Sequence, residues 1–108
     1  MPKDQYLMVL CTFPNAAEAR QIGTQLVDLQ VAACVNLIPQ IESIYRWKGE
    51  IKSETEVMVL IKTTQNNYRE LEARIQELHP YDMPEVIAVP IEHGASAYLG
   101  WISEMTRD

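Results

Sequence analysis

The sequence has few of the features that define several large classes of protein. The chain of 108 residues has only two cysteines, Cys11 and Cys34, and they form no CxxC pair. This argues against a disulfide framework and predicts reduced thiols, as in cytoplasmic proteins. No apolar run approaches the ~20 residues that a transmembrane helix needs, and the N-terminus lacks the apolar core and cleavage site of a signal peptide. We therefore expect a cytoplasmic protein without a membrane partner.

Basic residues and catalytic motifs are also scarce. Nine Lys and Arg residues stand against fifteen Asp and Glu residues, which gives a net charge of −6. Proteins that bind nucleic acids normally present a basic surface, so we expect no nucleic-acid partner. The sequence has no Gly-rich phosphate loop, GxSxG elbow or HExxH motif. Cys11 with His79 is the one candidate pair of nucleophile and base, and we predict that the protein is not an enzyme.

The hydrophobic pattern predicts one α+β domain over residues 1–108. Gly23 lies inside a predicted helix, where it costs roughly 1 kcal/mol against alanine, and this favours a close contact between helix and sheet. The order β-α-β-β-α-β is typical of the ferredoxin-like fold, an antiparallel sheet with two helices on one face. The predicted elements are a strand at 6–12, a helix at 13–30 capped by Asn15, strands at 32–48 and 50–64, a helix at 66–79 capped by an asparagine, a strand at 85–93, and a C-terminal helix at 96–108.

The hairpin formed by residues 32–48 and 50–64 is too long for a domain of this size. Two strands of ~15 residues would reach roughly 50 Å, whereas such a domain has a radius of gyration of about 13 Å. One interpretation is that the strands are shorter and contain a bulge at Pro39. We favour the other, in which the outer hairpin packs against neighbouring subunits of a closed homo-oligomer. The residues predicted to lie in that interface are Ile44, Tyr45, Trp47 and Ile51.

The segment "HPYDMPE" at 79–85 follows the second helix directly. In the ferredoxin-like order the first and last strands are antiparallel neighbours, so Cys11, His79, Asp82 and Glu85 are expected at one edge of the sheet. Thiolate, imidazole and carboxylate groups together suit zinc or copper. Alternatively, Cys11 is a small buried hydrophobe and His79 a helix-end residue between turn-forming prolines. Of the two thiols, we expect Cys11 to be the more reactive and Cys34 to be buried and inert.

Five blocks of the sequence together resemble one protein family, the CutA family of divalent-cation tolerance proteins, in order and over nearly the whole chain. The resemblance implies a ferredoxin-like subunit in a tight homotrimer, similar in architecture to the PII signalling proteins, with the long hairpins in the contacts between subunits. It also implies a cytoplasmic protein linked to tolerance of copper and other divalent cations, without established enzymatic activity. The blocks are "VLCTFPN" at 9–15, "AACVNLIPQIESIYRWKGEI" at 32–51, "LIKTT" at 60–64, "HPYDMPEVIAVPI" at 79–91 and "YLGWI" at 98–102.

The resemblance further implies metal ligands. The ligands proposed for copper in this family are a cysteine, which maps onto Cys11, and two adjacent histidines, the second of which maps onto His79. Leu78 occupies the position of the first histidine, and the predicted topology adds Glu85 to the site. We thus expect weak binding of Cu(II) or another divalent cation by Cys11, His79 and Glu85. The alternative is a PII-like regulator that binds a small molecule or a partner protein in clefts between subunits.

Overall fold

The computed structural model describes residues 5–107 and has the predicted ferredoxin-like α+β fold, with the additional helix at its C-terminal end. All three strand pairs are antiparallel, and the sheet order is β2-β3-β1-β4. The expected pairing of the first and last strands is therefore confirmed. None of the described helices is long and apolar enough to cross a membrane. The elements are β1 (Tyr6–Phe13), α1 (Ala16–Asp28), β2 (Cys34–Trp47), β3 (Glu50–Thr64), α2 (Gln65–Leu78), β4 (Ile87–Ile91) and α3 (Ser96–Met105).

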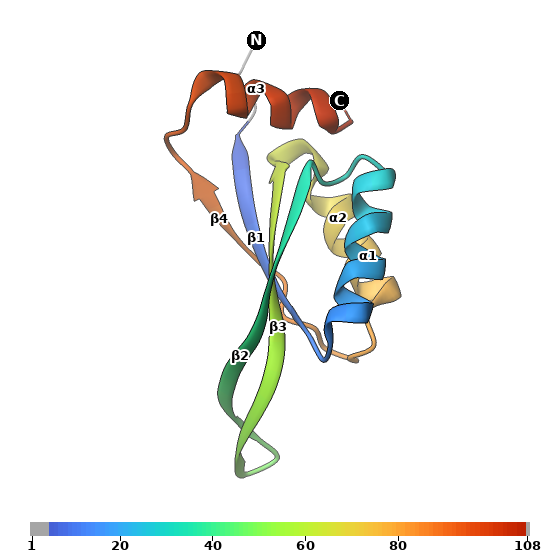
Figure 1. Cartoon of the computed structure of the whole chain (residues 1–108), viewed down its shortest axis with the longest axis vertical. Helices are drawn as coiled ribbons and strands as arrows, with labels where there is room; N and C mark the ends of the chain where they lie inside the picture. Colours follow the sequence, from blue (N-terminus) through green and yellow to red (C-terminus); the bar gives the residue numbers. More distant parts are fainter. Residues whose placement is uncertain (1–4, 108) are drawn as a thin grey trace.

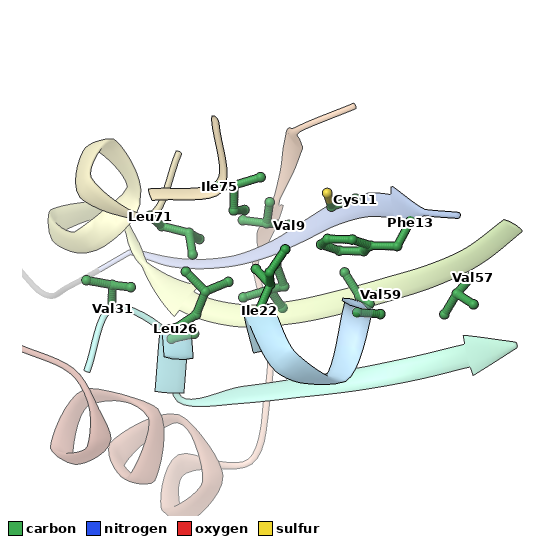
Figure 2. Packing of buried hydrophobic residues seen from close by; sticks show 13 residues of the cluster. Val9, Cys11, Phe13, Ile22, Leu26, Val31, Val57, Val59, Leu71 and Ile75 are labelled. Carbon is green, nitrogen blue, oxygen red and sulfur yellow. The ribbon is translucent and has the colours of Figure 1, made fainter. Parts of the chain in front are cut away.

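Helices α1 and α2 cover one face of the sheet (Figure 1). Side chains alternate between the faces of a strand, and the alternate residues of β1 and β3 point into the core beneath these helices (Figure 2). Burial of each large apolar side chain contributes about 1.5–3 kcal/mol. The strand residues of this core are Val9, Cys11, Phe13, Val57, Val59 and Ile61, and the helices add Ala19, Ile22, Leu26, Leu71 and Ile75.

The two helix starts differ in how well local sequence rules predict them. Asn15 caps α1 as expected, because its Oδ1 accepts the Glu18 N–H at 2.9 Å. The asparagine cap expected for the second helix is wrong. The strand β3 runs directly into α2, which begins at Gln65, and Thr64 occupies the cap position without a side-chain capping bond. Asn67 instead donates to Thr64 Oγ1 at 2.8 Å.

The hairpin of β2 and β3 extends well beyond the helices (Figure 1), and the molecule measures 49 × 25 × 21 Å. Pairing is continuous to Trp47 and Glu50 apart from one register shift between Ile38 and Ile41. This is the bulge predicted at Pro39, with Gln40 at a φ of 60°. The bulge is therefore present, but the strands are not shortened by it.

The second face of the sheet is apolar and largely uncovered. Met8 and Leu10 of β1 and Met58 and Leu60 of β3 alternate with core residues and therefore point away from α1 and α2. Helix α3 covers one end of this face, where it packs on β3 and Tyr6 Oη lies 2.7 Å from Ser103 Oγ. We refer to Met8, Leu10, Met58, Leu60 and their neighbours Ile38, Ile87 and Val89 as the open face.

Gly23 allows the close contact between helix and sheet that its position predicted. A Cβ atom at this residue would lie 3.1 Å from Val35 Cγ1, which is shorter than ordinary van der Waals contact. The helix can pack this closely on β2 because no side chain separates them.

We predict that Gly23→Leu will destabilise the fold by about 1–3 kcal/mol, because the added side chain overpacks the contact with β2. Val35→Ala in the same chain should recover part of the loss, and a double-mutant cycle from urea unfolding measures this coupling. Gln21→Leu, at an exposed position of the same helix, is the control and should change stability by less than about 0.5 kcal/mol. Equal effects at both positions would contradict the packing role of Gly23.

Candidate functional site

The 79–85 segment lies beside the C-terminal end of β1, as the topology predicted. His79 ends α2, and its backbone N–H donates to Ile75 O at 2.8 Å. Its extended backbone, with φ −72° and ψ 141°, then directs the chain away from the helix axis. The segment passes the end of β1 and leads into β4, so parts of the chain far apart in sequence meet here.

The His79 ring is fixed by two hydrogen bonds and two aromatic contacts. Its Nε2 lies 2.7 Å from the carbonyl oxygen of Thr12, and its Nδ1 accepts the Tyr81 backbone N–H at 3.0 Å. Because a carbonyl can only accept, Nε2 must carry the proton and donate it. The ring also stacks on Phe13, with centroids 4.4 Å apart, and tilts against Tyr81 at 4.8 Å. Both ring nitrogens are therefore engaged in hydrogen bonds, and only 7% of the residue is exposed.

Cys11 is fully buried in the core and points toward the helices (Figure 2). Its thiol donates weakly to Thr12 O, with a sulfur–oxygen distance of 3.8 Å. Burial raises the pKa of Cys11 to about 12. The nearby charges of Glu85 and Glu56 also raise it, whereas the hydrogen bond to Thr12 O lowers it. The expectation that Cys34 is the buried thiol is wrong, because Cys11 is buried and Cys34 is partly exposed. The apolar strand gave no alternation from which the direction of Cys11 could be predicted.

Glu85 is exposed as a residue, but its carboxyl group is partly shielded from water, and this partial burial, followed by the charge of Glu56, raises its pKa. Glu56 itself is 8% exposed, and its Oε2 accepts the Tyr81 hydroxyl at 2.8 Å. Sequence reasoning missed Glu56. Glu56 lies two residues before Met58 and therefore on the same face of the sheet, away from α1 and α2. No local signal predicts that Tyr81, from a distant loop, covers it.

Cys11, His79 and Glu85 share one neighbourhood, but their arrangement does not fit a metal centre within a single chain. To bind a metal, Cys11 would have to be a thiolate and His79 would need a free lone pair on a ring nitrogen. The Cys11 thiol instead has a raised pKa, and both His79 nitrogens are hydrogen-bonded. Across residues 5–107, no group of three or more His, Cys, Asp or Glu side chains is placed to hold an ion. The geometry instead fixes the segment to the end of β1.

The four residues predicted for the subunit interface lie on the outer hairpin and divide between its two faces. Tyr45 and Trp47 lie on one face, and Ile44 and Ile51 lie on the other, since Ile51 pairs with Arg46. Ile51 continues the β3 face of Val57 and Val59, but it lies beyond the core and is 63% exposed. Both faces of the hairpin therefore carry exposed apolar side chains.

We predict that His79→Ala will destabilise the native protein by about 2–4 kcal/mol, because it removes an aromatic contact and two hydrogen bonds of a buried ring. His93→Ala, at an exposed histidine, is the matched control and should have little effect. Urea unfolding of both variants measures the difference. Equal stability of the two would show that the contacts of His79 contribute nothing to folding.

The same histidine should make stability depend on pH. Burial lowers the pKa of His79 below its ordinary value of 6.5, although Thr12 O and the charges of Glu18 and Glu56 oppose this. The unfolded chain then takes up the proton first, so this contribution is complete above pH 6.5 and is lost as the pH falls through the lower, native pKa. We expect unfolding measured from pH 7 downward to show a shallower loss for His79→Ala than for the native sequence. Parallel curves would contradict a neutral, buried His79.

Comparison with known proteins identifies the family. The family model described as CutA1 divalent ion tolerance protein matches residues 7–105. The divalent-cation tolerance protein CutA of Thermus thermophilus is 44% identical over 99 residues, which cover 92% of this chain and 96% of that protein. The human protein CutA is 45% identical over 96 residues, 89% of this chain, and the chain spans only 54% of its length.

Solved structures agree with the sequence comparisons. The divalent cation tolerance protein from Thermus thermophilus superimposes with a TM-score of 0.92 at 43% identity, covering 94% of this chain and 99% of that one. CutA1 from Oryza sativa superimposes with a TM-score of 0.94 at 36% identity, covering 96% and 95% of the two chains. Both the sequence and the arrangement of strands and helices are thus shared, and the chain belongs to the CutA1 family of divalent ion tolerance proteins.

Proposed function

We propose that this protein acts in divalent-cation tolerance as a cytoplasmic, non-enzymatic homotrimer that binds cations weakly. The observation that carries the proposal is the open face, an apolar sheet surface that the chain leaves largely uncovered. Ile38, Ile87 and Val89 are 42%, 54% and 40% exposed there. Continuous apolar surfaces of this kind are unusual on monomers and mark interfaces.

The edges of the sheet favour a closed ring of subunits. β2 and β4 are the two edge strands, and each has one unpaired side. The part of β2 before the bulge, Cys34–Ile38, matches the length of β4. Joining β2 of one copy to β4 of the next uses different surfaces on the two copies, and such contacts form rings when the rotation closes. A ring of three, the number that the family resemblance implies, would turn the open faces inward.

The outer hairpin supports the same assembly. Because Ile44 and Ile51 lie on one face and Tyr45 and Trp47 on the other, covering the hairpin requires contacts on both sides. A neighbouring subunit on each side supplies them in a ring, whereas a dimer covers one side only. We therefore assign all four residues to the interface between subunits.

The cytoplasmic location rests on the state of the thiols. Both Cys11 and Cys34 are free, and unpaired cysteines are typical of reducing compartments. The absence of catalysis rests on the same residues, because the Cys11 thiol is buried and both His79 nitrogens are occupied. Neither side chain is available as nucleophile or base.

Weak cation binding follows from the donors that remain accessible. Of the three expected ligands, Glu85 alone is exposed, and a single carboxylate fills only part of the shell of Cu(II) or Zn(II). Ligation by Cys11 or His79 would require the segment to open and the bonds to Thr12 and Tyr81 to break. We therefore assign the contact with cations to Glu85, assisted by the acidic net charge of −6.

One observation favours a second candidate function, a PII-like regulator that binds a small molecule. A groove of about 420 Å³ runs between α1 and β2 and is lined by Arg20, Gly23, Thr24, Val27, Asp28, Val35 and Leu37. It lies along the unpaired edge of β2, where a neighbouring subunit would complete it. A ligand bound there raises the melting temperature, so a thermal-shift panel of metabolites distinguishes this function from cation binding.

We predict that the native protein sediments as a trimer at low concentration and that Trp47→Glu or Ile51→Glu loosens it, because each buries an unpaired charge. Trp47→Phe keeps an apolar ring and should leave the trimer intact. Sedimentation velocity measures all four proteins. A native monomer would refute the proposed assembly, and loosening by only one of the two Glu variants would assign the interface to one face.

We predict that Glu85→Gln weakens binding of Cu(II) and Zn(II) several-fold in calorimetry without changing the sedimentation coefficient. Asp82→Asn removes another exposed carboxylate of the same segment and serves as the control. Cys11→Ser should leave the affinity unchanged because solvent does not reach that residue. If Cys11→Ser abolishes binding and Glu85→Gln does not, the buried site forms after all and the segment must open.

A further inference from the structure

The groove between α1 and β2 lies where one more strand would continue the sheet. It measures about 420 Å³, and Val35 and Leu37 of the edge strand β2 line one side of it. Helix α1 packs very closely on β2 at Gly23, where a Cβ atom would lie 3.1 Å from Val35 Cγ1. The exposed residues Thr24 and Val27 of α1 line the other side. A strand that joins this edge must pass beneath the helix, so only small side chains fit on that side of the strand.

The hydrogen-bond pattern shows which residues of β2 offer free backbone groups. In an antiparallel pair, alternate residues bond to the partner strand and the residues between them point away. The Gln65 N–H donates to Gln5 O at 2.8 Å, so every second residue of β3 from there bonds to β1. The residues between them bond to β2, where their partners are Cys34, Asn36 and Ile38. Val35 and Leu37 therefore direct their N–H and C=O groups to the free edge.

The free edge of β4 has the matching pattern. Because alternate residues of β1 bond to β3, the residues between them bond to β4, and this leaves the backbone of Ala88 and Pro90 pointing away from β1. Proline suits this position, since it has no N–H to donate to β1. Ala88 pairs with Val9 and Pro90 with Leu7. Val9 and Leu7 are buried beneath the helices, so Ala88 and Pro90 lie on that same side of the sheet, where both are exposed.

We propose that β4 of one subunit fills the groove of the next and pairs with β2 there, with Ala88 beside Leu37 and Pro90 beside Val35. The inference rests on the proposed trimer, which joins these two edges, and it adds the register of the strands and the occupant of the groove. Within the chain β2 and β4 run in opposite directions, and a sheet that continues around the ring keeps them antiparallel. Leu37 and Ala88 then exchange two hydrogen bonds, and the Val35 N–H donates to Pro90 O.

This register suits both sides of the joined sheet. Beneath α1 it places the small side chains of Ala88 and Pro90. On the open face it brings Ile38 opposite Ile87 of the next subunit, and these residues are 42% and 54% exposed in the single chain. A shift by one residue would turn Ile87 and Val89 into the groove, where the close packing of α1 leaves too little room. A groove filled by the neighbouring strand has no space for a metabolite.

Cysteine cross-linking tests the register. Cys34→Ser first removes the partly exposed thiol. In this background, Leu37→Cys together with Ala88→Cys should link each subunit to the next on oxidation and give a covalent trimer on a non-reducing gel, because directly opposed residues lie within disulfide range. Asn36→Cys together with Ala88→Cys is the matched control. Asn36 lies on the opposite face of β2 from Leu37, so this pair should give no cross-linked species.

Large side chains test the occupant of the groove from both of its sides. Thr24→Phe on α1 and Ala88→Phe on β4 each place a ring where helix and incoming strand meet, and both positions are exposed in the single chain. Each variant should shift sedimentation from trimer toward monomer, because the ring overpacks the contact. Gln21→Phe, at an exposed position of α1 that does not line the groove, should leave the trimer intact.

Sedimentation of the native protein separates this inference from the trimer itself. A native monomer overturns both. A native trimer that forms no cross-link between positions 37 and 88 overturns the register, and one that both Phe variants leave intact overturns the strand in the groove; in either case the trimer stands. A metabolite that raises the melting temperature of the native trimer but not that of Thr24→Phe would place a small molecule in the groove and also overturn the inference.

Discussion

The constraint on which the rest of this structure depends is that an apolar sheet has two faces and this chain supplies helices for one. Helices α1 and α2 bury the face of Val9, Val59 and Ile61, whereas α3 covers only one end of the other face, beside Tyr6 and the end of β3. A stable domain buries both faces when both are apolar. In the proposed assembly the second layer comes from other copies of the chain, which would join at the unpaired edges of β2 and β4.

At the end of β1, the hydrogen bonds that fix His79 in the structure also prevent its ring from binding a metal. A ring nitrogen that accepts the Tyr81 N–H cannot also bind a metal, and a nitrogen that donates to Thr12 O has no lone pair left. Stacking on Phe13 fixes the same ring orientation. The residues that suggest a metal site in the sequence are therefore the ones that hold the segment against the sheet. A histidine can be a ligand or a bridge between backbone groups, and its hydrogen bonds decide which.

Much of the fold could be predicted because local rules fix it. The cap at Asn15, the close approach at Gly23 and the bulge at Pro39 each follow from the chemistry of one residue. The direction of Cys11 could not be predicted, because a wholly apolar strand shows no alternation. The bulge also adds a residue to β2 and changes which side chains share a face, which separates Trp47 from Ile51. Burial of Glu56 depends on Tyr81, and no local pattern joins residues so far apart.

The bulge between Ile38 and Ile41 divides the sheet into two parts with different physical character. On the side of the bulge nearer the helices, the strands carry one charged residue, Lys62. Any layer that covers this part of the sheet would therefore be held mainly by burial of apolar side chains. Below it the hairpin alternates apolar and charged side chains, with Ser53 donating to Glu42 at 2.5 Å and Lys52 paired with Glu50. Exposed pairs of this kind stabilise little, so the hairpin has few strong contacts of its own within the chain. In the proposed trimer the apolar body of the sheet would drive association, and the apolar side chains on both faces of the hairpin would pack against neighbouring subunits.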